Sequence, residues 1–222
     1  MTLREAIARF LEHSGESVKD APQSFALLTA CFSPDITLDE ITPTNLRGFL
    51  ARWYIEQVSS TSEEDRTIEP QLLCDALAEF FSWAESGAEE HLRILAELRQ
   101  SLPRALEISA SLSQILAERG GAFGFPEFLT SFEEGGHSSS YDLDTAGETG
   151  AIEGYFRITR IEGALVEAEE IITEERVWPI NFPPDLASRF IIDYIINLEL
   201  VRSKEGWQIA ACGFAYPPGT NV

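Results

Sequence analysis

The stretch GYFRITRIEG, residues 154–163, marks the point where the sequence changes from helical to strand periodicity. Its side chains fall into two alternating sets, Tyr155, Arg157, Thr159 and Ile161 against Phe156, Ile158 and Arg160. Such alternation is typical of a half-buried strand. Because the residues before this point follow helical spacing, the sequence predicts an α+β protein with a helical N-terminal part and a small β module.

The β module is predicted to contain about five strands. After residues 154–163, the segments LVEAEEII (165–172) and EERVWPINF (174–182) each favour a strand, and DLASRF (185–190) favours a short helix begun by Pro184-Asp185. The clearest hairpin joins DYIINLELVR (193–202) to GWQIAACGFAYP (206–217). We therefore expect a twisted antiparallel sheet or a small open barrel.

Four helices are predicted in the first 86 residues. Leu3, Ile7 and Phe10 recur at helical spacing, and a second short helix fits residues 25–32. Thr42-Pro43 has the residue types that begin a helix, and a fourth helix begins near Pro70. The polar stretch 59–66 is expected to be the loop between the last two.

The order of these helices resembles the N-terminal core-binding (SAM-like) domain of phage-integrase-type tyrosine recombinases. The matching segments span about residues 3–86 and are AIARFLE (6–12), FALLTACF (25–32), ITLDEITPTNLRGFLARWYIEQ (36–57) and TIEPQLLCDALAEFFSWAE (67–85). The resemblance implies a recombinase-like four-helix bundle with DNA contacts at Arg47, Arg52 and Arg66. It does not imply recombination, because no catalytic domain follows and His91 is not part of a His-x-x-Arg motif.

A long helical connector follows the bundle. Leucines of residues 88–118 lie on or near one helical stripe, and Pro103 either kinks this helix or begins a new one. The stripe either packs on the preceding helices or forms the seam of a homodimer. The Gly- and Ser-rich stretch 120–153 is predicted to be a linker or lid, which divides the chain into domains at 1–119 and 154–222.

The charge of the chain counts against two classes of partner. The formal net charge is −21, from 37 acidic and 16 basic residues, and residues 1–100 alone carry 18 acids against 8 bases. Nucleic acids and anionic membranes both require positive surfaces, so neither is an expected partner. No apolar run approaches the roughly 18 residues that span a bilayer. Three widely spaced cysteines form no disulfide pattern, which favours a reducing cytoplasm.

No catalytic, cofactor or metal site is predicted from the motifs. His13, His91 and His137 stand in different segments without a helical ligand partner, so we expect them to be surface or incidental residues. The loop around Asp142 and Asp144 is either solvated or a weak cation site. An enzyme remains an alternative only if a site forms at the domain junction around residues 125–150.

The best candidate for a binding surface is aromatic. The β module holds five aromatic residues among prolines, and these either line a groove for a partner or fill the core: Trp178, Phe182, Trp207, Phe214 and Tyr216. The leading hypothesis is a non-catalytic interaction or regulatory protein that engages a protein partner. The alternative is a DNA-associated accessory protein that uses the three arginines of the bundle.

We expect the purified protein not to bind DNA even at low salt, where electrostatic attraction is strongest. A salt-titrated binding assay, run beside a measurement of oligomeric mass, checks this expectation. Binding that weakens steeply with added salt would contradict it and would point to Arg47, Arg52 and Arg66.

Overall fold

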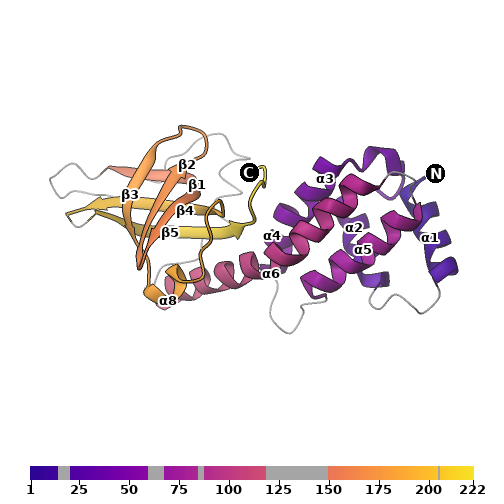
Figure 1. Ribbon diagram of the computed structural model, residues 1–222, viewed down its shortest axis with the longest axis horizontal. Helices are drawn as coiled ribbons and strands as arrows, with labels where there is room; N and C mark the ends of the chain where they lie inside the picture. The colour runs from indigo at the N-terminus through magenta and orange to yellow at the C-terminus, as the bar shows by residue number, and fades with distance from the viewer. Residues whose placement is uncertain (15–20, 60–67, 85–87, 119–149, 205) are drawn as a thin grey trace. The chain divides into compact units, whose positions relative to one another are not determined.

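The computed structural model describes residues 1–14, 21–59, 68–84, 88–118, 150–204 and 206–222 (Figure 1). These residues form two compact units, one made of Met1–Glu107 with Tyr216–Val222 and one made of Ile108–Ala215. The first unit is helical and the second contains the strands. The predicted combination of helices and strands is therefore confirmed. Most of the predicted linker or lid, 120–153, lies outside the described residues.

The described N-terminal part of the chain contains six α-helices, the last of which extends from the helical unit into the second unit. Their bounds are α1 (Leu3–Ser14), α2 (Ala21–Cys31), α3 (Pro43–Gly48), α4 (Ile55–Ser59), α5 (Pro70–Ala84) and α6 (Glu89–Glu118). A 3₁₀ turn, η1 (Leu38–Glu40), precedes α3, and a π-helical segment, η2 (Phe49–Tyr54), joins α3 to α4. The hydroxyl of Thr42 accepts a hydrogen bond from the Asn45 N–H at 3.2 Å, as expected of a residue that caps a helix. Pro103 lies inside α6, which is one helix.

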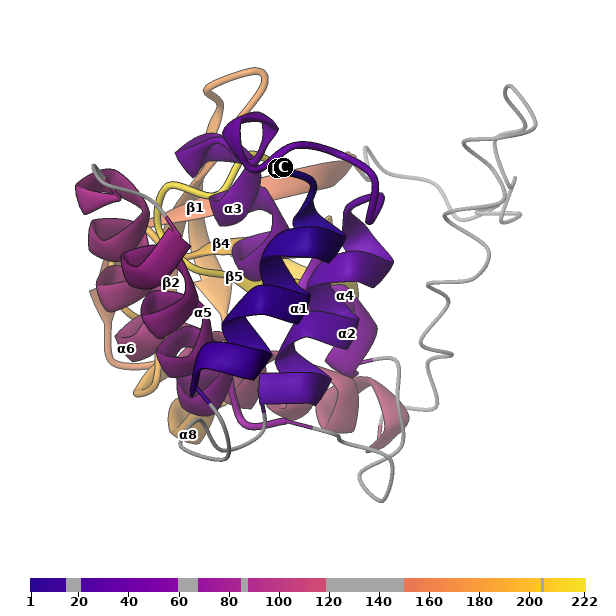
Figure 2. The same cartoon turned by 90° about the vertical axis from the view of Figure 1, so that its right-hand side faces the viewer.

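Aromatic rings fill the core of the helical unit, where α1 packs beside α2 and α5 (Figure 2). Phe10, Phe25 and Phe80 meet with ring centroids 5.2–5.6 Å apart. Contacts of this kind add to the free energy gained by burying the rings. The segment from α3 through η2 also contributes to this core through the buried residues Leu46, Phe49, Leu50 and Tyr54, whereas Trp53 is only half-buried.

His91 is buried, although the sequence analysis treated it as a surface or incidental residue. Its side chain in α6 is 7% exposed, and its ring stacks on Phe81 at 4.6 Å with an interplanar angle of 7°. Its Nε2 donates a hydrogen bond of 2.7 Å to the Ile41 carbonyl. The imidazole is therefore a core group that satisfies a backbone acceptor, which composition alone could not indicate.

Residues 216–222 complete the helical unit. Arg47 of α3 donates to both carboxylate oxygens of Glu97 in α6, at 3.1 and 2.7 Å, and to the Pro218 carbonyl at 3.2 Å. The Tyr216 hydroxyl donates to Glu56 at 3.1 Å, and Thr220 is buried. One guanidinium thus joins two helices to a segment that follows the last strand, through the fork of donors that distinguishes Arg from Lys.

The strands form a closed barrel in the order β1-β2-β3-β5-β4 (Figure 1). Their bounds are β1 (Ala151–Glu162), β2 (Leu165–Glu170), β3 (Arg176–Asn181), β4 (Ile195–Ser203) and β5 (Gly206–Tyr216), with the short helix α8 (Pro184–Ala187) between β3 and β4. The pairs β1–β2, β2–β3 and β1–β4 are antiparallel, whereas β3 and β5 are parallel at Ile180 and Trp207. The prediction of a wholly antiparallel sheet is wrong because one strand pair is parallel, and the prediction of an open barrel is wrong because the barrel is closed.

The parallel pair and the closure share one cause. After β3 the chain does not return beside it but passes through α8, and β4 then pairs with β1 on the far side. The place next to β3 is left for β5, which runs in the same direction. The strands β4-β1-β2-β3 lie in the spatial order of a Greek key, and β5 closes the sheet into a barrel.

The barrel core contains large apolar side chains from several strands, and the end of α6 packs with it. Phe156, Ile158 and Phe214 are each at most 1% exposed. Ser109 of α6 accepts a hydrogen bond from the Ala215 N–H at 2.9 Å, and Cys212 donates to the Leu112 carbonyl at 3.7 Å. Residues 108–118 therefore belong with the barrel rather than with the helices before them.

A buried carboxylate closes the turn between β2 and β3. Glu170 is 7% exposed, and its Oε2 accepts hydrogen bonds from the backbone N–H groups of Ile172, at 2.9 Å, and Thr173, at 2.6 Å. Gly154 of β1 faces this side chain so closely that a Cβ at that position would lie 2.8 Å from the Glu170 Oε1. Glycine at 154 therefore gives the carboxylate the room it needs to cap the turn.

We expect Gly154→Ala to lower the free energy of unfolding by about 1–3 kcal/mol, because the added methyl group must displace Glu170 from its backbone donors. Urea denaturation measures the change. Gly150→Ala is the matched control, since a Cβ there meets nothing within 4 Å. Equal stability of the two variants would show that Glu170 moves aside without cost.

Candidate functional site

The structure divides the five aromatic residues that were candidates for partner binding. Phe182, Phe214 and Tyr216 are buried, at 4%, 1% and 0% exposure, so they serve the core. Trp178 is 36% exposed and Trp207 is half-buried. Of the predicted set, these two indoles alone remain accessible to a partner.

Trp178 and Trp207 do not form one surface. Residues two apart on a strand normally face the same side. Trp178 and Ile180 of β3 do not, because the register shifts between them: Trp178 is exposed and Ile180 is buried. Trp207 is the direct neighbour of Ile180 in the parallel pair, so it lies on the inner side of the sheet. There it lines a cavity of about 660 Å³ with Ile152 and Arg202, whose guanidinium lies 5.9 Å from its ring. Trp178 faces outward instead.

A β-bulge brings Arg160 to the outer face that also holds Arg157, Arg176 and Trp178. The register of β1 and β2 shifts between Ile158 and Arg160, so that Arg157 pairs with Glu169 and Arg160 pairs with Glu167. Simple alternation placed Arg160 with the inward residues Phe156 and Ile158. That expectation is wrong, because the extra residue in the bulge reverses the direction of every side chain after it.

We call this surface the Trp178 face, and its residues come from β1, β2 and β3: Arg157, Arg160, Glu162, Glu167, Glu169, Arg176 and Trp178. The Glu169 carboxylate accepts hydrogen bonds from Arg157 at 2.7 Å and from Arg176 at 3.1 Å. These hydrogen bonds hold the pKa of Glu169 below its ordinary value, and the bond from Arg157 has the larger effect. Arg160 pairs with Glu162 and Glu167, and its guanidinium lies 4.7 Å from the centre of the Trp178 ring. The face thus presents an indole within a charge-balanced network.

Two of the three arginines proposed for DNA contact are held by carboxylates of the helical unit. The Arg47 side chain is 17% exposed and binds Glu97 and the Pro218 carbonyl. Arg52 pairs with Glu56, four residues along, at 3.2 Å. Arg66 lies outside the described residues. Neither described arginine is therefore free of a carboxylate that would oppose a phosphate.

Other kinds of site find no support among the described residues. In the ranges that the structure describes, no three His, Cys, Asp or Glu side chains are grouped so as to hold a metal ion, and no helix is long and apolar enough to cross a membrane. Burial raises the pKa of the Cys74 thiol to about 12, which disfavours the reactive thiolate. The loop with His137, Asp142 and Asp144, and with it most of the junction 125–150, lies outside the described residues.

Comparisons of this chain with protein-family models, curated proteins and solved structures found no match. Its function must therefore be argued from the geometry and charge of its own surfaces.

Two carboxylates oppose each other on the neighbouring side of the barrel. Glu153 of β1 is the direct cross-strand partner of Glu199 in β4. Burial, and then the charge of Glu199, raise the pKa of the Glu153 carboxyl above its ordinary value. Like charges placed directly across a strand pair destabilise it.

We expect Glu153→Gln to raise the free energy of unfolding at pH 7 by up to about 1 kcal/mol. A raised pKa means that the folded protein binds more protons than the unfolded chain, so the wild type loses stability as the pH rises through that pKa. The gain should therefore shrink as the pH is lowered toward 4. Denaturation of the two proteins across this range measures it. Glu199→Gln should give a smaller gain at pH 7, because it removes the opposing charge but not the burial of Glu153, and the double variant should gain less than the sum.

Proposed function

We propose that this chain is a non-catalytic interaction protein whose barrel engages a protein partner through the Trp178 face. The observation that carries the proposal is the partly exposed Trp178 indole with Arg160 placed over its ring. Tryptophan and arginine are the residues that most often contribute the binding energy of protein interfaces. Their apolar surfaces can be buried by a partner, while the surrounding ion pairs remain as a polar rim.

The charges of the Trp178 face favour a protein over a nucleic acid. In five-stranded Greek-key barrels of the OB type, the face of the second and third strands binds oligonucleotides and oligosaccharides, so its position suits recognition. Each of its arginines, however, already pairs with a glutamate: Arg157 and Arg176 with Glu169, and Arg160 with Glu162 and Glu167. A protein gains affinity for a phosphate backbone mainly when its unpaired cations neutralise phosphates and so release the counterions of the nucleic acid. A partner with its own mixed charges can instead exchange ion pairs with this face.

The helical unit is proposed to keep a recombinase-like bundle of four helices without its DNA contacts. The engagement of Arg47 with Glu97 and of Arg52 with Glu56 supports this reading, because both guanidinium groups act within the unit. In this proposal the unit serves as a scaffold and as an acidic surface, not as a clamp for DNA.

The test is quantitative affinity capture from an extract of the source cells, followed by measurement of the dissociation constant for the purified partner. We expect Trp178→Ala to weaken binding at least tenfold, or about 1.4 kcal/mol, because truncation removes the central contact. Ile191→Ala is the matched control: it removes a comparably exposed apolar side chain, 46% exposed, from the segment before β4.

Equal affinity of the wild type and Trp178→Ala would overturn the proposal. So would tighter binding of single- or double-stranded DNA, measured in the same buffer, than of any captured protein. Thermal unfolding of each variant confirms that the barrel is intact before affinities are compared.

A further inference from the structure

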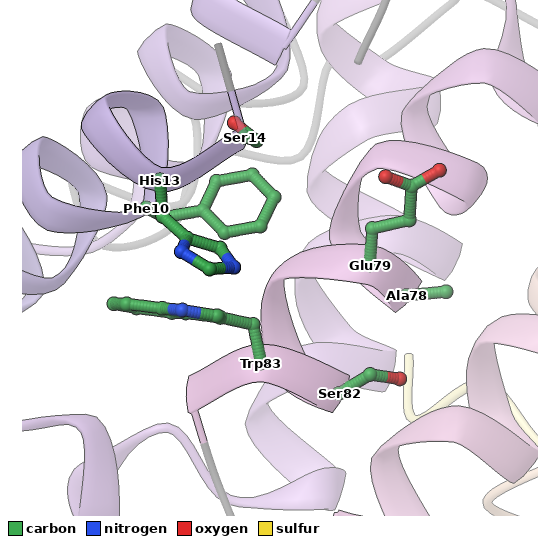
Figure 3. A pocket seen from close by; sticks show the side chains of 7 residues that line it. All are labelled: Phe10, His13, Ser14, Ala78, Glu79, Ser82 and Trp83. Carbon is green, nitrogen blue, oxygen red and sulfur yellow. The ribbon is translucent and has the colours of Figure 1, made fainter. Parts of the chain in front are cut away.

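A pocket of about 600 Å³ lies wholly within the helical unit, between α1 and α5 (Figure 3). This volume falls in the range of pockets that hold small ligands or single side chains. Phe10 and His13 line it from α1, and Glu79, Ser82 and Trp83 line it from α5. It is separate in the sequence and in the fold from the barrel.

Aromatic rings form its walls. The ring centroid of Trp83 lies 5.6 Å from that of Phe10 and 6.1 Å from that of His13. Figure 3 shows the rings of Phe10 and His13 on one side of the Trp83 indole. Phe10 is only 3% exposed and is held by Phe25 and Phe80, so the wall behind the indole is fixed by the core.

Three polar groups that line the pocket have no partner among the described residues. Within the described residues, the Glu79 carboxylate, the His13 ring nitrogens and the Trp83 N–H have no hydrogen bond or ion pair. One turn earlier on α5, Asp75 forms an ion pair with Arg99 at 2.6 Å. Glu79 is exposed and lies four residues before Trp83 on α5, so its carboxylate adds a negative charge to the lining of the pocket.

We propose that this pocket binds an arginine side chain from a basic segment of a partner protein. The planar guanidinium stacks on the Trp83 indole and forms an ion pair with Glu79. Its apolar stem lies along Phe10. Lysine is the poorer occupant, because a compact, strongly hydrated ammonium stacks less well on a ring.

The charge of the surrounding sequence favours a basic occupant over a neutral or acidic one. Residues 1–100 carry 18 acidic and 8 basic residues, so the helical unit attracts cations and repels carboxylates. This attraction raises the rate at which a basic segment reaches the surface, and the pocket then selects its arginine. The inference does not depend on the Trp178 face.

The test uses the full chain and N-acetyl-arginine amide as the probe. Nuclear magnetic resonance follows the indole N–H of Trp83, whose signal is identified by its loss in Trp83→Phe. We expect a saturable shift with a dissociation constant in the millimolar range, as for a single small contact. N-acetyl-norleucine amide, which lacks the charge, should bind at least threefold more weakly, and N-acetyl-glutamate amide should not bind.

Two variants separate a local ion pair from general attraction. Glu79→Gln should weaken binding of the arginine probe about threefold. Glu69→Gln is the control: it makes the same change in charge just before the start of α5 and should leave the affinity for the probe unchanged. Equal effects of the two variants would overturn the proposal, because they would reflect only the net charge. Equal binding of the norleucine probe, or no shift of the Trp83 signal, would overturn it as well.

Discussion

Carboxylates outnumber cationic side chains by 37 to 16, and this imbalance decides what the arginines of the chain do. Those that form ion pairs with a carboxylate occur in both units: Arg4, Arg47, Arg52, Arg93, Arg99, Arg157, Arg160 and Arg176. Each exposed pair contributes little to stability. Together, however, they place a carboxylate beside most of the described arginines, and both candidate binding surfaces combine an indole with a carboxylate or with balanced ion pairs.

The order of the elements could be predicted from the sequence, whereas their connections in space could not. Helical spacing, the Thr42 cap and strand alternation are local signals, and the structure contains elements at each of those places. Barrel closure and the parallel pair of β3 and β5 depend on which strand fills the place beside β3, a choice made between segments far apart in the chain. The inclusion of residues 216–222 in the helical unit depends on a similar distant contact, that of Arg47 with Pro218.

The sequence could indicate single residues of the candidate sites, but not the contacts between residues that lie far apart in the chain. Trp178 stands out as an aromatic residue in a strand, but its neighbour Arg160 reaches it only because a bulge reverses the alternation. Phe182 and Phe214 are buried, Phe182 against Phe190, and no local sequence pattern indicates this burial. The pocket of His13 and Trp83 joins two helices separated by most of the helical unit, so neither segment indicates it alone.

The position of residues 216–222 also bears on how the protein is made. The helices α1 to α5 emerge from the ribosome first, yet the segment that supplies the Pro218 carbonyl and the buried Thr220 is translated only after every strand of the barrel. During synthesis, Arg47 can therefore hold Glu97 but lacks its third contact. The unit that is translated first is thus completed last, and the nascent helices must persist in an unfinished state while the whole barrel is synthesised.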